Sequence, residues 1–119
     1  MTPDAFVDAV KNHVIGSGVR GVMKSLVAPP ERNPTSKRMA ATEWYNALGD
    51  EHRGYVENAV RDAAHASVFG LLCVLDGVRV IETGEKKSEF RLVCICPDGT
   101  EAVLNPSNGE MLHDILNAK

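Results

Sequence analysis

Two of the three cysteines, Cys94 and Cys96, are separated by a single residue in a stretch where apolar side chains alternate with others. In a β-strand this spacing puts both thiols on one face, about 6.6 Å apart along the strand. Two thiolates could bind one soft metal ion, although a closed zinc site needs four ligands. Free cysteines are also common as small core residues. We expect core packing and no cofactor here, with a metal site at Cys94 and Cys96 as the alternative.

Histidines and aspartates form a second group that could do chemistry. Asp62 and His65 are three residues apart on an expected helix and therefore share a face, His113 precedes Asp114, and His52 lies near a helix start. A histidine and a carboxylate brought together could act as an acid–base pair or bind a metal. Apart in space, they are ordinary polar residues of solvated helices. The sequence has no phosphate-binding glycine loop, nucleophile elbow or zincin helix, so we expect a protein that is not an enzyme.

Four residues are candidates for contact with a partner protein: Trp44, Tyr45, Arg79 and His113. Trp44 and Tyr45 follow a proline-rich stretch, and both types are favoured interface anchors because a large ring carries a polar group. A single tryptophan in a small domain is also often a core residue. Arg79 follows an apolar run and could contact a partner or form an ion pair with Asp76 or Glu82.

Composition limits the possible partners and compartments. The 119 residues suit one domain, residues 1–119, and the net charge of −3 comes without any basic run longer than two residues, so nucleic acid is not expected. An odd number of cysteines and no secretory signal predict a cytoplasmic protein. The apolar run Val68–Leu75 has eight residues, where a membrane span needs about twenty.

Helical patterns fill the first two-thirds of the chain. Thr2 followed by Pro3 is a helix start, and this helix is expected to end at Gly16 to Gly18. A short second helix, a mobile loop at 28–36 and a third helix capped by Thr35 or Ser36 follow. Apolar residues then recur at three and four over residues 50–75, which predicts one long helix. Gly70 would let another element approach closely, and Gly77 suits the left-handed position after a helix.

After Gly77 the period changes from 3.6 to two. Residues 78–82, 89–96 and 101–105 alternate as strands, with the turn sequence PDGT before the last of them. Residues 111–116 then predict a short terminal helix. The expected fold is α+β, with about four N-terminal helices, a three-stranded antiparallel meander and this helix.

The same region resembles a family of small bacterial α+β proteins with no known activity. In that family an apolar-Leu-Asp-Gly-Val-Arg segment links a helix to a short meander, and a Leu-His-Asp segment lies near the end. The resemblance spans residues 44–117, and its matching residues are Phe69, Gly70, Leu75, Asp76, Gly77, Val78, Arg79, Leu104, Asn105, Leu112, His113 and Asp114. It implies this fold and no particular function.

We therefore expect a cytoplasmic module that binds a protein, either a toxin that it neutralises or a second copy of itself. Its mild acidity would suit a basic toxin surface. The alternatives are a small enzyme or metal protein using the histidines, aspartates or cysteines, and a binder of a small apolar ligand in a cavity under the sheet. A large exposed apolar patch would favour a protein partner, and a polar cleft would favour chemistry.

Overall fold

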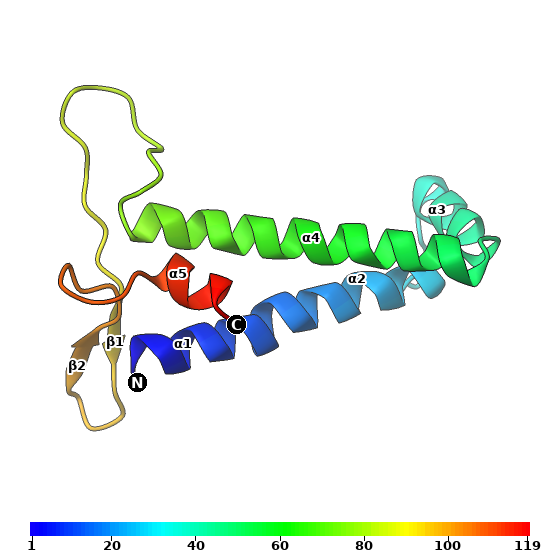
Figure 1. Ribbon diagram of the computed structural model, residues 1–119. Coiled ribbons are helices and arrows are strands. Elements are labelled where there is room, and N and C mark those ends of the chain that lie inside the picture. The colour runs from blue at the N-terminus through cyan, green and yellow to red at the C-terminus, as the bar shows by residue number, and fades with distance from the viewer. The chain divides into compact units, whose positions relative to one another are not determined.

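Helices form most of the first 75 residues, and an antiparallel hairpin and a final short helix follow. The computed structural model describes residues 1–119 (Figure 1). The elements are α1 (Pro3–Val10), a π-helical turn (Lys11–Gly16), α2 (Ser17–Val27), α3 (Ser36–Asn46), α4 (Asp50–Leu75), β1 (Val93–Ile95), β2 (Glu101–Val103) and α5 (Leu112–Asn117). The α+β class, the long helix at 50–75 and the short final helix are as predicted.

The chain divides into two compact units, and each is described by itself. One unit consists of residues 1–12 with 66–119, and the other of residues 13–65. The first unit holds α1, the hairpin and α5, and the second holds α2 and α3. Helix α4 contributes residues to both.

Local sequence determines three of the helix ends. The Thr2 hydroxyl accepts a hydrogen bond from the Ala5 N–H at 3.1 Å, and the Thr35 hydroxyl accepts one from the Arg38 N–H at 3.2 Å. Gly77 ends α4 with a φ of +78°, and the N–H of Val78 reaches back to the Cys73 carbonyl at 2.9 Å. This is the Schellman arrangement that a glycine in this position favours.

The expectation that the first helix ends at Gly16 to Gly18 is wrong. The helix passes through the π-helical turn into α2, and Gly16 keeps right-handed helical angles. Each glycine within a helix costs about 1 kcal/mol relative to alanine, which packing of an apolar face can offset. Val19, just beyond the glycines, is buried, so packing explains why the helix continues.

In the unit of residues 13–65, α2 packs against α3. The Asn46 side chain donates to the Val27 carbonyl at 3.0 Å, which ties the ends of the two helices together. Tyr45 is buried, and the Arg53 guanidinium lies 5.5 Å from the centre of its ring. Val19 and Tyr45 are the buried apolar residues of this unit.

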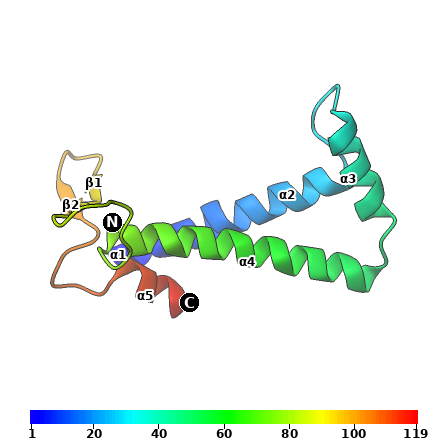
Figure 2. The same ribbon diagram turned by 90° about the horizontal axis from the view of Figure 1, so that it is seen from above.

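In the other unit, α5 lies beside α1 (Figure 2). The buried apolar residues of this unit are Val7, Leu72, Cys73, Leu104, Leu112, Ile115 and Leu116. Lys119 forms ion pairs with Asp8 at 2.8 Å and with Asp4 at 3.2 Å, and the hydrogen bond to Asp8, followed by that to Asp4, raises the pKa of the lysine. Apolar packing and these surface pairs therefore join the first helix to the last.

The sheet has two strands, and the predicted third strand at 78–82 is wrong. Strands β1 and β2 pair antiparallel, with Val93 opposite Val103 and Ile95 opposite Glu101. Residues 78–92 form no strand (Figure 1). The side chains of Val80 and Ile81 are 62% and 65% exposed, so the alternating pattern has no core to face. The other two strands are also shorter than expected.

Both ends of residues 78–92 are bonded outside the sheet. The N–H groups of Val78 and Arg79 both donate to the Cys73 carbonyl at the end of α4. At the other end, the Asn105 side chain bonds to the Phe90 carbonyl and the Leu92 N–H. These four groups, two near each end of the segment, therefore bond to the end of α4 or to Asn105 and not to a neighbouring strand.

Candidate functional site

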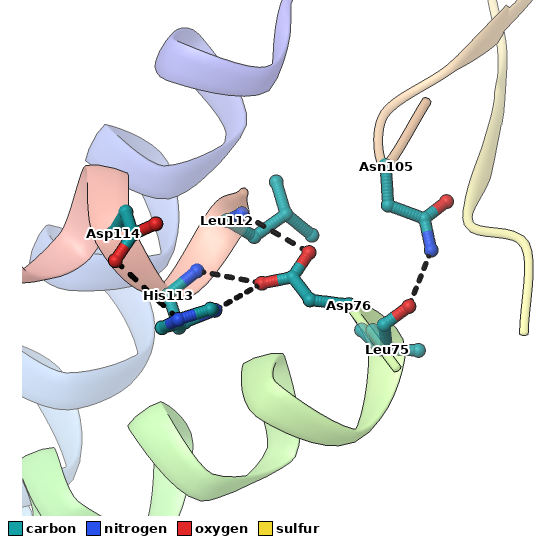
Figure 3. A network of polar contacts seen from close by, with 6 residues as sticks. All are labelled: Leu75, Asp76, Asn105, Leu112, His113 and Asp114. Carbon is teal, nitrogen blue, oxygen red and sulfur yellow. Dashed lines mark hydrogen bonds and ion pairs between the residues drawn. The ribbon is translucent and has the colours of Figure 1, made fainter. Parts of the chain in front are cut away.

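The strongest cluster of polar contacts surrounds Asp76, directly after α4 (Figure 3). Its carboxylate is 2% exposed and accepts hydrogen bonds from the N–H groups of Leu112 at 3.1 Å and His113 at 2.9 Å. Its Oδ2 atom also lies 2.7 Å from the His113 Nδ1 atom. Asp76 therefore caps the first turn of α5 across a separation of 36 residues and fixes the orientation of a histidine ring.

His113 lies between two carboxylates. Its Nδ1 atom contacts Asp76, and its Nε2 atom is 3.4 Å from an oxygen of the exposed Asp114 (Figure 3). The Phe69 ring meets the His113 ring edge-on, with centroids 5.6 Å apart. An aspartate that orients a histidine is half of a common acid–base arrangement. Asp76 also accepts hydrogen bonds from the backbone of α5, so the pair joins the end of α4 to α5.

Asn105 makes a second buried connection at the same helix end. Its amide nitrogen donates to the carbonyls of Leu75 at 2.7 Å and Phe90 at 2.9 Å, and its oxygen accepts from the Leu92 N–H at 2.8 Å. The residue is 7% exposed. Sequence reasoning included Asn105 only through the family resemblance. The sequence does show a polar residue directly after Leu104, at the end of an apolar strand. That position does not indicate which groups the residue would bond to.

A cavity of about 380 Å³ adjoins these residues within the same unit. Among its lining residues are Asp76, Lys87, Phe90, Asn105 and Met111. The polar atoms of Asp76 and Asn105 are engaged as described, and the Lys87 ammonium donates to the carbonyls of Glu82 and Gly84. A ligand site normally directs several available polar groups at one ligand, and these three are already in use.

Arg79 lies against helix α4 rather than in an ion pair. Its guanidinium occupies the space that a side chain at Gly70 would need, so the expected close approach at Gly70 is confirmed. The expected pairing with Asp76 or Glu82 is not found: Asp76 pairs with His113, and Glu82 accepts from Ser88. The glycine thus makes room for a cation beside the helix backbone.

Trp44 and Tyr45 differ in their availability to a partner. Trp44 is 56% exposed on α3, whereas Tyr45 is 6% exposed and packs beneath Arg53. Both belong to the unit of residues 13–65, while Arg79 and His113 belong to the other unit. Of the four candidate residues, Trp44 is the one that presents a large exposed ring.

Two of the other histidines, His52 and His65, lie on α4, and His13 lies in the π-helical turn. The His52 ring is 6.1 Å from that of Tyr55, and Asp62 and His65 lie within one turn of the helix. Among residues 1–119, no group of three or more histidines, cysteines, aspartates and glutamates is arranged to hold a metal ion. The structure therefore does not support a metal site with three or more of these side chains as ligands.

The hairpin has two chemically different faces. On the outer face, defined by Val93, Ile95, Glu101 and Val103, the three apolar side chains are 42%, 70% and 43% exposed. The inner face is defined by Leu92, Cys94, Cys96, Ala102 and Leu104, which are half-buried or buried. Strand alternation produces this division, and the predicted shared face of Cys94 and Cys96 is confirmed.

The turn after β1 influences the second thiol. Hydrogen bonds with the Thr100 hydroxyl, and then with Cys94, lower the pKa of the Cys96 thiol. The same hydroxyl lies 2.7 Å from Asp98 Oδ1, and bonds from the Thr100 side chain and backbone lower the pKa of Asp98. The PDGT turn therefore places polar groups beside Cys96, with Gly99 at a φ of +86°.

No family model matches this chain, and no curated protein or solved structure is significantly similar to it. No helix is both long and apolar enough to cross a membrane. Function is therefore inferred from the geometry of the chain itself.

Proposed function

We propose that this chain is a protein-binding module that associates with a second copy of itself through the outer face of the hairpin. The observation that supports this is the exposure of Val93, Ile95 and Val103 on one face of two hydrogen-bonded strands. The side chains of the opposite face are half-buried or buried. Contiguous exposed apolar side chains are typical of surfaces that bind another protein.

The chemistry of the outer face favours a second copy as the partner. Its centre is aliphatic, and its one charged residue, Glu101, lies at the end of β2. Such a surface is complementary to another apolar surface, and a two-fold axis supplies an identical one. A two-stranded hairpin is also marginally stable by itself, so pairing would stabilise it.

The expected affinity is low. Fully burying a valine or isoleucine contributes about 1.5–3 kcal/mol, and these side chains are already partly buried. Association also costs translational and rotational freedom, estimated at several kcal/mol. Three aliphatic residues on each copy therefore predict a concentration-dependent dimer, with a Kd that is about micromolar or weaker.

Sedimentation velocity over a wide concentration range tests this proposal. The wild-type chain should shift from monomer to dimer, and Ile95→Lys should remain a monomer with an unchanged circular dichroism spectrum, because a lysine cannot be buried in the aliphatic contact. Val27→Lys is the matched control, since Val27 is 53% exposed at the end of α2 and should leave the dimer intact.

Two outcomes would contradict self-association: a wild-type chain that is monomeric at every concentration, or an Ile95→Lys variant that still dimerises. The first would favour a heterologous partner, such as a neutralised toxin, over a second copy. The second would place the contact between copies elsewhere.

A further inference from the structure

The inner face of the hairpin carries a pair of thiols that the proposed association does not use. We propose that Cys94 and Cys96 form a two-coordinate site for a soft monovalent cation such as copper(I). The two residues lie two positions apart on the inner face of one strand, about 6.6 Å apart along it. Both are half-buried and within reach of solvent. The third cysteine, Cys73, is buried in α4.

The hairpin holds both cysteines in place. Cys94 lies opposite Ala102 in the strand register, and the Cys96 N–H donates to the Thr100 carbonyl at 2.7 Å. The small side chain of Ala102 leaves the Cys94 thiol without a bulky cross-strand neighbour. Because the backbone is fixed on both sides of the pair, a metal ion would meet two ligands that are already close together.

Ligand type and number select the ion. Thiolates are soft ligands and favour copper(I), whereas structural zinc requires four ligands in a tetrahedron. Among the 119 residues, no histidine, aspartate, glutamate or third cysteine joins the two cysteines in a larger group. A pair of thiolates therefore suits an ion that accepts two-fold coordination.

The binding step balances without a redox change. Two S–H bonds break, two copper–sulfur bonds form, and two protons pass to solvent, so that one copper(I) ion and two thiolates carry a net charge of −1. Residues 97–100 are exposed, which leaves the pair open at the turn.

Anaerobic titration of the reduced chain with copper(I), in competition with the chromophoric chelator bicinchoninate, tests this site. The wild-type chain should remove one copper ion per chain. Cys94→Ser and Cys96→Ser should each weaken binding about 100-fold or more, because one thiolate alone is an incomplete site. Cys73→Ser is the matched control and should bind as the wild type does. Equal binding by Cys94→Ser, or an equal loss in Cys73→Ser, would overturn the assignment.

A measurement on the unmutated chain covers variants that fail to fold. One equivalent of copper(I) should protect Cys94 and Cys96 from N-ethylmaleimide, as mapped by mass spectrometry of peptides. Alkylation of both cysteines at an unchanged rate would contradict the site. Sedimentation of the copper-loaded Ile95→Lys variant separates this site from the outer-face contact, since a monomer that still binds one copper ion holds the metal within one chain. Copper binding that requires a dimer would show a site shared between chains and would overturn the proposal.

Discussion

The end of α4 and the segment after it, residues 78–92, satisfy their polar groups in opposite ways. At the helix end, the buried side chains of Asp76 and Asn105 bond to backbone groups of distant residues. Within the segment, the exposed Glu82 carboxylate accepts from the Ser88 N–H at 2.7 Å and from its hydroxyl at 2.8 Å. Water can replace the second set of partners but cannot easily reach the first, so the two regions should differ in their contribution to stability.

The largest effect is expected for Asp76→Ala. The change removes an acceptor from two N–H groups of α5 and from His113, which leaves partly buried donors without partners. The free energy of unfolding from urea titration should fall by about 3 kcal/mol or more. Asp114→Ala, which removes an exposed carboxylate from the same ring, is the control and should cost less than about 1 kcal/mol. If both variants lost the same free energy of unfolding, burial of the carboxylate would not be the cause of the effect.

Asn105→Ala is expected to come next. It leaves the carbonyls of Leu75 and Phe90 and the N–H of Leu92 without their partner, and the free energy of unfolding should fall by about 2 kcal/mol. The exposed Asn108→Ala is the control and should unfold at the same urea concentration as the wild type. A neutral Asn105→Ala would mean that water takes over these bonds as readily as in the exposed segment.

Gly77→Val tests the backbone at the same helix end. A β-branched residue at a φ of +78° is strained, and the melting temperature should fall in line with a loss of about 1 kcal/mol or more. Gly77→Asn should lose less, because asparagine tolerates the left-handed region. An unchanged melting temperature for the valine variant would refute this account of the junction.

The smallest effect is expected at Glu82, which is fully exposed. Hydrogen bonds from the Ser88 N–H, and then from its hydroxyl, hold the pKa of Glu82 below its ordinary value. A lowered carboxylate pKa stabilises the folded state above the unfolded pKa, and this contribution is lost as the pH falls through the folded pKa. Carboxyl NMR titration should show a low midpoint that rises in Ser88→Ala, while the urea midpoint stays unchanged. A large stability loss in Ser88→Ala would remove the contrast with Asn105.

Sequence reasoning succeeded where a property is local. The Thr2 and Thr35 caps, the long apolar stripe of α4 and the left-handed Gly77 depend on neighbours within a few residues, and the structure has all of them. The prediction of a third strand was wrong. Apolar and polar residues alternate at 78–82, but no other part of the chain covers the apolar side chains. Val80 and Ile81 are therefore exposed.

The polar cluster could not be predicted in the same way. Asp76 and His113 are 37 residues apart, and Asn105 lies 30 residues from Leu75, so their pairing depends on how α5 and the hairpin pack. The residue types were visible, but their partners were not. The shared face of Cys94 and Cys96 was predictable because it follows from strand geometry over three residues.

The position of Asn105 has a further consequence for chemical ageing. Asparagine deamidates when the next backbone nitrogen attacks its side-chain amide, and that nitrogen in Pro106 carries no hydrogen. Three hydrogen bonds also hold the Asn105 amide in place. The exposed Asn108 precedes Gly109 and has neither protection. During prolonged storage, acidic charge variants should therefore accumulate at Asn108, while the residue that holds the helix end to the hairpin stays intact.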